Sequence, residues 1–334
     1  MDHRPKMDEH HNSHAYLKLS RNSSVRSKKL TIPAEYSFAR YLSVKKSIDD
    51  RSLNYHVWNT LLQLLQKSYH DIPFRILEVG AGIGTMIERI LDWNLLGHII
   101  YTAIDVQAEN KVQALERLQV WAARHSIRLE VNSDWILTDI NRQTKIKFEI
   151  RDFYDFASHE NGKWDLIIAN AFLDLMDIRS TLPLMLKLTE KGSLFYFTIN
   201  FDGLTILEPV IDKEIDELIL KLYHQTMDER LINGTRSGDS QAGRHLFSQL
   251  KEAGMQILDS GASDWVIFPG QNGYSQDEAY FLHFILNTIQ QALEGSSHID
   301  SATLDNWISE RHNQVENNIL IYVAHQLDFV GIIA

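Results

Sequence analysis

Apolar residues along this chain follow two alternating patterns, short runs typical of β-strands and longer amphipathic stretches typical of helices. Five strand-like runs are found at residues 74–80, 98–106, 146–152, 164–177 and 193–201. Helix-like segments such as TMIERILDWNLL and NKVQALERLQVWAARH follow the first two runs. Strands that alternate with helices predict a parallel sheet with helices on both faces. The fourth run should leave the sheet near Asn170.

The two ends of the chain follow other patterns. Residues 32–68 carry aromatic and aliphatic side chains at helical spacing, which predicts two or three helices. After Pro209 the chain shows four helix-like stretches, a strand-like run at 255–269 and a final strand-like run at 319–333. We expect these last two runs to join the same sheet.

These elements divide the chain into regions. We predict a disordered tail over residues 1–30, a helical lid over 31–70 and one α/β domain over 71–334. Helical insertions are expected at about 203–250 and 277–316. Because no linker of low complexity separates them, we expect these insertions to lie within one sheet and to have no core of their own.

Composition narrows the choice of protein class. Of the 334 residues, 44% are hydrophobic and 23% are charged, which is typical of a globular protein with a sizeable core. The net charge of −11 disfavours a nucleic-acid partner, because such proteins present clustered Lys and Arg. No apolar run approaches the roughly 20 residues that span a bilayer. We therefore expect neither a nucleic-acid partner nor a membrane.

The chain contains no cysteine. Disulfides, thiolate nucleophiles and Cys-ligated metal sites are thereby excluded, and a reducing compartment suits such a chain. The first 29 residues also lack the apolar segment of a secretory signal. We expect a cytoplasmic protein.

Three glycines within five residues, Gly80, Gly82 and Gly84, form a turn between the first strand and the first helix of the predicted sheet. Such a turn brings backbone N–H groups close to a ligand at a helix N-terminus. A dinucleotide-binding turn would need a third glycine at position 85, which is Thr85. Glu78 lies just before the turn and would repel a pyrophosphate, so the turn favours a cationic ligand.

At this turn the chain resembles the class I S-adenosylmethionine-dependent methyltransferases, whose first motif is E/D-x-G-x-G-x-G. All four motif positions match, with Ala81 between the first two glycines. The resemblance covers about residues 55–200 and implies S-adenosyl-L-methionine as the cofactor. It places Glu78 near the amino end of the methionyl group. It also implies a Rossmann-like, doubly wound, mostly parallel sheet of seven strands, with an antiparallel last strand.

Further cofactor residues follow in the family's order. Asp105 ends the second strand, followed by Val106, and would accept hydrogen bonds from the ribose hydroxyls. The resemblance has Asp152 bind the adenine amino group and Phe153 stack on the adenine ring. Asn170 lies in the fourth motif, where cofactor and substrate meet. Asp105 has the alternative role of a helix N-cap, and Asp152 that of a polar loop residue.

The fourth motif also bears on the methyl acceptor. Nucleic-acid amino methyltransferases of this fold carry N-P-P-Y there, whereas this chain has Asn170-Ala171-Phe172-Leu173. The metal-dependent catechol type needs an Asp-Asn pair that is missing here, so we expect no metal. We expect a small-molecule methyl acceptor, and a homodimer is left open.

Aromatic residues are frequent in the predicted lid and insertions. As residues that line the acceptor site we predict Tyr36, Tyr41, Phe172 and Trp265, together with Asn200 after the fifth strand. For any single ring, a place in the core is the more frequent alternative. The other aromatic residues in these regions are Phe38, Phe201, Tyr223, Tyr280 and Phe284.

Methyl transfer needs a nucleophile placed about 3 Å from the methyl carbon and, in some enzymes, a base. Asp174, which follows the fourth strand, is the best candidate for a catalytic residue, although a carboxylate there could equally orient an acceptor amine without taking its proton. The remaining candidates are Asp202, His245, Asp264, His283 and His325.

The leading hypothesis is therefore a methyltransferase that acts on N or O of a small, apolar or aromatic metabolite. Protein or peptide methylation is one alternative and should show an open acidic groove. A non-catalytic, methyltransferase-like scaffold subunit is another, and the intact first motif speaks against it. A nicotinamide-dependent oxidoreductase is disfavoured by Glu78 and Thr85.

Overall fold

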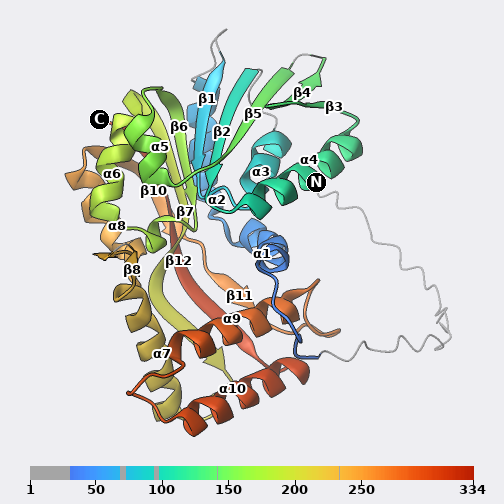
Figure 1. The fold of residues 1–334 in the computed structure, drawn as a ribbon, viewed down its shortest axis with the longest axis vertical. Helices are drawn as coiled ribbons and strands as arrows, with labels where there is room; N and C mark the ends of the chain where they lie inside the picture. Colours follow the sequence, from blue (N-terminus) through green and yellow to red (C-terminus); the bar gives the residue numbers. More distant parts are fainter. Residues whose placement is uncertain (1–30, 68–72, 94–97, 141, 233) are drawn as a thin grey trace, which may run out of the picture.

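A single central sheet organises the chain in the computed structural model, which describes residues 31–67, 73–93, 98–140, 142–232 and 234–334. Its strands follow the order β10-β12-β7-β6-β1-β2-β5-β4-β3, and β11 pairs with β12 outside this path (Figure 1). The predicted tail over residues 1–30 lies outside the described residues.

Five strands of this sheet run parallel, as the sequence predicts. They are β1 (Phe74–Val79), β2 (His98–Asp105), β5 (Arg142–Ile150), β6 (Trp164–Asn170) and β7 (Thr189–Glu208). The last strand, β12 (Ile321–Ile333), lies antiparallel between β7 and β10 (Met255–Ala262). The predicted antiparallel last strand is thus confirmed.

Of the strands that this sheet has beyond the seven predicted, two lie outside the predicted runs, and the third arises because the run at 255–269 divides in two. β3 (Arg128–Val131) and β4 (Trp135–Asp139) form an antiparallel hairpin on the edge of β5, and β11 (Trp265–Ile267) pairs with β12. β3 is short and has no fully buried residue, so its sequence lacks the apolar run that marks a strand. This polar edge strand suits its position, because charged side chains on an edge oppose further strand pairing.

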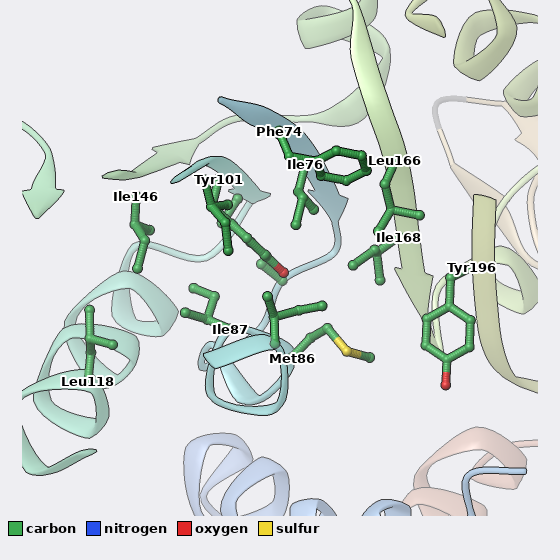
Figure 2. Close-up of a cluster of buried hydrophobic side chains, with 14 of the residues drawn as sticks. Phe74, Ile76, Met86, Ile87, Tyr101, Leu118, Ile146, Leu166, Ile168 and Tyr196 are labelled. Atoms are coloured by element: carbon green, nitrogen blue, oxygen red, sulfur yellow. The ribbon is translucent and has the colours of Figure 1, made fainter. Parts of the chain in front are cut away.

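Successive side chains of the central strands point to opposite faces, and each face has its own hydrophobic cluster. On β1, Ile76 belongs to one cluster and Leu77 to the other. The Ile76 cluster packs against helices α2 (Tyr55–Lys67), α3 (Thr85–Trp93) and α4 (Ala108–His125) (Figure 2). The Leu77 cluster packs against α5 (Phe153–His159), α6 (Ile178–Lys187) and α8 (Ala242–Glu252). The sheet is therefore doubly wound.

Beyond the sheet, β7 and β12 continue downward as a ribbon that carries a second layer of helices (Figure 1). The helices around it are α1 (Phe38–Ser52), α7 (Lys213–Asp228), α9 (Glu278–Leu293) and α10 (Ser301–Glu316). Their buried side chains form a third hydrophobic cluster with the ends of the two strands and with β11. The helices of the insertions therefore share their hydrophobic cluster with two strands of the central sheet.

A buried carboxyl group marks where the ribbon leaves the sheet. Ile199 of β7 has a φ of 56°, a left-handed conformation that is strained for a β-branched residue. Its N–H donates to Asp328 Oδ1 at 2.7 Å, and Asn54 N–H at the start of α2 donates to Asp328 Oδ2 at 2.8 Å. Burial raises the pKa of Asp328 to about 6. This carboxyl group therefore fixes the bend of β7 to both β12 and α2.

The remaining elements are short. They are the 3-10 turn η1 (Leu173–Leu175) after β6 and the hairpin of β8 (Leu231–Ile232) and β9 (Thr235–Arg236) after α7. Across the part of the chain that the structure describes, no helix combines the length and the apolar character needed to cross a membrane.

Candidate active site

The predicted glycine-rich turn lies at the carboxyl end of β1 and leads into α3. Gly80, Gly82 and Gly84 have φ values of 67°, 51° and 76°, which other residues adopt only with strain. A Cβ at Gly80 would come within 2.5 Å of the Phe172 ring, and one at Gly84 within 3.0 Å of Ala114 Cβ. The sequence thus needs glycine here both for backbone conformation and for close packing.

Asp105 ties this turn to the end of β2. Its Oδ2 accepts a hydrogen bond from Gly82 N–H at 2.8 Å, while Oδ1 accepts from Gln107 N–H at 2.9 Å and from Asn110 Nδ2 at 3.0 Å. Residue Gln107, and not Asp105, is the N-cap of α4. A carboxylate offers about four acceptor positions, so at least one stays free for a ribose hydroxyl. Val106, the next residue, is 58% exposed.

The predicted adenine residues lie at the start of α5. Asp152 is exposed and caps the helix, with Oδ1 accepting from Tyr154 N–H at 2.8 Å and from Asp155 N–H at 3.2 Å. Among the described residues, nothing donates to its Oδ2, which leaves that oxygen for an adenine amino group. Phe153 is only 3% exposed and packs edge-on to Phe172, with ring centroids 6.1 Å apart. Core packing accounts for Phe153, and its stacking on adenine stays a prediction.

Glu78 is buried beneath the turn. Tyr101 O–H donates to its Oε2 at 2.7 Å, and the Tyr101 ring belongs to the cluster that α3 covers (Figure 2). Burial raises the pKa of Glu78 to about 8, although the Arg89 guanidinium acts in the opposite direction. Glu78 is therefore mostly neutral at pH 7 in the ligand-free chain. Its contact with a methionyl amino group stays a prediction.

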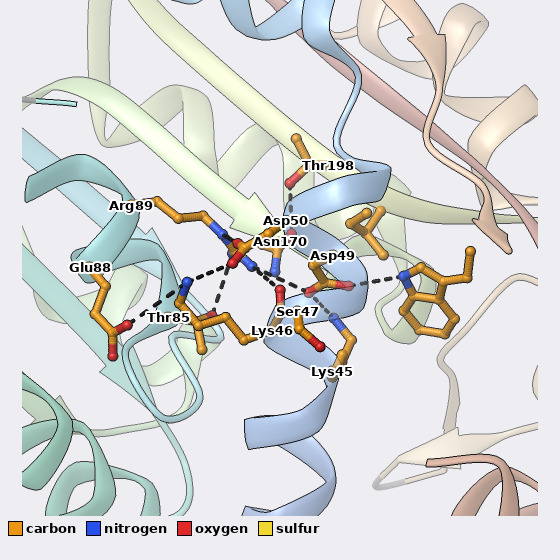
Figure 3. Close-up of polar contacts among 12 residues, drawn as sticks. Lys45, Lys46, Ser47, Asp49, Asp50, Thr85, Glu88, Arg89, Asn170 and Thr198 are labelled. Carbon is orange, nitrogen blue, oxygen red and sulfur yellow. Dashed lines mark hydrogen bonds and ion pairs between the residues drawn. The ribbon is translucent and has the colours of Figure 1, made fainter. Parts of the chain in front are cut away.

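Helix α1 of the predicted lid lies across the turn (Figure 3). Arg89 of α3 forms an ion pair with Asp50 of α1 at 2.7 Å, and Lys46 binds the same carboxylate at 2.7 Å. A Cβ at Gly82 would lie 3.6 Å from Leu42 Cδ1. The charged side chains thus hold α1 directly above the backbone of the turn.

A second ion pair on the same helix is fully covered. Lys45 and Asp49 are 7% and 2% exposed and meet at 2.6 Å. Asp49 also accepts a hydrogen bond from Trp265 Nε1 at 2.9 Å. Trp265, a predicted acceptor residue, is 7% exposed. Its hydrogen bond to Asp49 holds α1 against β11. Its contact with a substrate stays a prediction.

The end of β6 brings the fourth motif to this place. Asn170 Oδ1 accepts a hydrogen bond from Thr198 Oγ1 at 2.8 Å, and Ala171 turns the chain with a φ of 50°. The next residue, Phe172, packs on Gly80. These contacts bring the end of β6, the glycine turn and the start of η1 together at one edge of the sheet.

Asp174 in η1 differs from the other candidate bases. Its Oδ1 is buried without a hydrogen-bond partner, and burial raises the pKa of Asp174 to about 6 despite the charges of Lys45 and Arg230. The other candidates bind one another or a neighbour, as in the contacts His245–Asp239 at 2.6 Å, His325–Asp264 at 2.7 Å, Arg244–Asp202 at 2.9 Å and His283–His312 at 2.7 Å.

The remaining predicted acceptor residues divide into two groups. Tyr41 stacks on Phe284 of α9 with ring centroids 4.2 Å apart, and Tyr36 lies 6.0 Å from the same ring. Both tyrosines thus belong to the lid. Asn200 is completely buried, and its Nδ2 donates to Leu327 O at 2.9 Å between β7 and β12. A role for Asn200 at the substrate stays a prediction.

Sequence reasoning missed Tyr322 and gave Tyr223 no special role. Tyr322 lies on β12 and is 5% exposed, and Tyr223 lies on α7. Only the alternation of buried residues along the last strand could have marked Tyr322 as inward-facing. Within the described ranges, no three His, Asp or Glu side chains are placed to hold a metal ion.

Comparisons with known proteins give a likeness of fold. A candidate sarcosine dimethylglycine methyltransferase from Galdieria sulphuraria is 14% identical and covers 87% of both chains at a TM-score of 0.39. A cyclopropane synthase from Mycobacterium tuberculosis is 9% identical over 80% of this chain and 83% of its own, with a TM-score of 0.38. A geranyl diphosphate methyltransferase, in complex with GPP and sinefungin, is 7% identical over 83% of this chain and 79% of its own, also with a TM-score of 0.38. No family model and no curated protein matches the sequence.

The chain's own features carry the assignment of fold. Five parallel strands are followed by an antiparallel pair, with the last strand inserted beside β7. The E-x-G-x-G-x-G turn follows β1, and Asp105 binds it from the end of β2. The chain thus has a doubly wound α/β fold with an antiparallel last strand, and its E-x-G-x-G-x-G turn lies at the carboxyl end of β1.

Proposed function

We propose that this protein transfers a methyl group from S-adenosyl-L-methionine to nitrogen or oxygen of a small, apolar or aromatic molecule. The observation that supports this most directly is the glycine turn, whose Gly82 N–H is bound by the Asp105 carboxylate under the cover of α1. The same edge of the sheet presents an exposed Asp152 with a free Oδ2. These groups suit a nucleoside with an attached amino acid.

Each part of the cofactor would have a partner in this arrangement. Asp105 would hold the ribose, and Asp152 would hold the adenine amino group. The turn would lie against the methionyl part, because glycines carry no side chain that would keep a ligand away from the backbone. When bound, the cofactor supplies a methyl group on a sulfonium sulfur, which is a cationic donor. The chain's own task is then to exclude water and to orient the acceptor.

Burial of the acceptor region supports a small molecule over a peptide. A peptide acceptor would need an open trench, whereas Asp174 Oδ1 is buried and charges on both α1 and the end of α7 act on Asp174. The lid helices pack on one another through aromatic side chains such as Tyr41 and Phe284. A small acceptor that enters by movement of the lid fits this arrangement better.

Calorimetric titration with S-adenosylhomocysteine tests the cofactor part of the proposal. The intact chain should bind it, and Asp105→Ala should weaken binding about tenfold or more, because a hydrogen bond to a charged group contributes about 1.5–3 kcal/mol. Glu109→Gln is the matched control, since it removes an exposed acid in the first turn of α4, four residues after Asp105, that has no partner among the described residues. Asp105→Asn, which keeps the side-chain shape, separates lost binding from lost folding. If the intact chain does not bind, the proposal is wrong.

A further inference from the structure

Four polar side chains from distant parts of the sequence meet beneath the lid. Tyr41 comes from α1, Asp174 from η1, Tyr223 from α7 and Tyr322 from β12. We call them the tyrosine–carboxylate cluster. Tyr322 belongs to the hydrophobic cluster of the lid helices, and Tyr41 and Tyr223 pack against it. Burial raises the pKa of all three tyrosines, and the charge of Asp174 adds to this effect at Tyr41 and Tyr223. Electrostatic effects of this kind need short distances and poor access of water.

The polar atoms of this cluster lack partners within the protein. No described residue forms a hydrogen bond with the hydroxyl group of Tyr41, Tyr223 or Tyr322, and Asp174 Oδ1 is buried and unpaired. Other tyrosines of the same cluster of lid helices do form hydrogen bonds through their hydroxyl groups. Tyr280 O–H donates to Ser37 O at 3.0 Å, and Tyr274 O–H donates to Leu320 O at 2.8 Å. A buried polar atom without a partner is rare and costly, so Asp174 Oδ1 beside three hydroxyl groups that form no hydrogen bond with a described residue indicates a binding site.

The cluster adjoins the proposed cofactor site. Ala171 at the end of β6 packs against the same hydrophobic cluster as Tyr41 and Tyr223. Its neighbour Phe172 packs on Gly80 of the glycine turn. A molecule bound at the tyrosine–carboxylate cluster therefore lies beside the place where the methyl donor would be held.

We infer that the tyrosine–carboxylate cluster binds the methyl acceptor and that this acceptor is a small amine with an apolar body. This inference rests on the proposed function. An amine offers N–H donors, and an ionised carboxylate can only accept hydrogen bonds. The tyrosine hydroxyls can accept as well, and their rings can lie against the cation. A carboxylate or phosphate acceptor would instead meet the negative charge of Asp174.

The charged side chains near Asp174 leave its carboxylate available to bind an amine. Lys45 lies within its electrostatic reach but forms its ion pair with Asp49 at 2.6 Å. Arg230 also acts on Asp174, yet among the described residues no cation comes within 4.0 Å of its carboxylate. Asp239 acts in the opposite direction. Asp174 is therefore available to a cationic ligand.

Asp174 can also take up the proton that the amine must lose before it reacts. An amine arrives as the ammonium ion at neutral pH, and one proton passes to the carboxylate to leave a neutral amine with a free lone pair. The lone pair forms the nitrogen–carbon bond as the carbon–sulfur bond breaks, and the electron pair of that broken bond stays on sulfur. The positive charge moves to nitrogen, and the proton on Asp174 is lost to water. A buried carboxyl with a pKa of about 6 suits this exchange.

The test compares amines with matched alcohols and acids. The full chain, saturated with S-adenosylhomocysteine, is titrated calorimetrically with 2-phenylethylamine, 2-phenylethanol and 3-phenylpropanoate, and with aliphatic amines and alcohols of increasing length. At least one amine should bind about tenfold more tightly than its alcohol and its acid, as expected for a charge-assisted hydrogen bond. If no amine exceeds its matched alcohol, the inference is wrong.

Two variants test whether the tyrosine–carboxylate cluster causes the preference for amines over alcohols. Asp174→Asn should remove the preference for amine over alcohol, and Tyr322→Phe should weaken amine binding several-fold, while both bind S-adenosylhomocysteine as the intact chain does. Glu217→Gln is the control, because this acid is exposed on the same helix as Tyr223 and pairs with Lys213 at 4.0 Å. A preference that survives both substitutions would contradict the assignment. Loss of S-adenosylhomocysteine binding by the intact chain would instead contradict the proposed function, so the two failures are distinct.

Discussion

Two buried carboxyl groups near the candidate site have pKa values far above those of free side chains. Burial raises the pKa of Glu78 to about 8 and that of Asp174 to about 6. A carboxyl with a raised folded-state pKa stabilises the fold fully below its unfolded value and loses that contribution as pH rises through the folded value. For Glu78 this loss falls between about pH 4.5 and pH 8. The ligand-free chain should thus be less stable in mild alkali than in mild acid.

Replacement of Glu78 tests this behaviour. Glu78→Gln keeps the acceptor for Tyr101 O–H and cannot ionise. We expect the variant to be more stable than the intact chain at about pH 8, by roughly 2 kcal/mol or more, because each pKa unit corresponds to about 1.4 kcal/mol. Urea unfolding at several pH values from about 5 to 9 measures the difference. Parallel pH profiles for the two proteins would show that Glu78 does not carry the effect.

Gly80 allows a second prediction about single residues. Gly80→Ala adds both the cost of a positive φ and a Cβ that would lie 2.5 Å from Phe172. Gly192→Ala is a matched control, because Gly192 has a φ of 87° and no neighbour within 4 Å of the added Cβ. The control should lose about 1 kcal/mol and Gly80→Ala about 2–4 kcal/mol, together with binding of S-adenosylhomocysteine. Equal losses in the two variants would mean that Phe172 moves aside freely.

At the scale of elements, α1 is held by charge as well as by apolar contact. Arg89 is 4% exposed and lies between Asp50 at 2.7 Å and Asp49 at 3.8 Å. Arg89→Met should destabilise the protein by about 3 kcal/mol, because removal of one partner leaves buried Asp49 without that charge. It should also speed hydrogen exchange in residues 38–52. Arg128→Met, which breaks an exposed pair with Glu130, should change stability by less than about 1 kcal/mol.

The elements also show what the sequence can predict. Runs such as FRILEVG mark buried parallel strands, because both faces of such a strand are apolar. The β3 and β4 hairpin has no such run, and β7 continues past Phe201 through Asp202 and Gly203, which look like a turn. The cofactor-side residues follow their strands in order and could be placed by number. Tyr322 could not be linked to Tyr41, because only the folding of β12 beside β7 brings it into the cluster against which Tyr41 packs.

For the whole molecule, β7 joins three hydrophobic clusters. Tyr196 belongs to the cluster under α3, Phe197 to the cluster under α6, and Phe201 to the cluster of the lid helices. A single strand that takes part in all three should make the described parts unfold together. We therefore expect coincident transitions in near- and far-ultraviolet circular dichroism.

A substitution far from the upper sheet tests this coupling. Phe201→Ala should lower the free energy of unfolding by about 3–5 kcal/mol and shift both spectral transitions equally. Leu204→Ala is the control, because Leu204 is 50% exposed on the same strand. Separate transitions in Phe201→Ala would show that the lid helices unfold independently of the sheet.

The position of β12 has a consequence for how the protein is made. A ribosome completes β7 and β10 well before residues 321–333, yet β12 must pair with both of them. Until then, the growing chain presents two unpaired strand edges, the kind of surface that chaperones shield and that misassembles when it is not shielded. Translation of the final strand then closes both edges in one step. A nascent chain stalled before Ile321 should stay bound to chaperones, and a chain released after Ile333 should not.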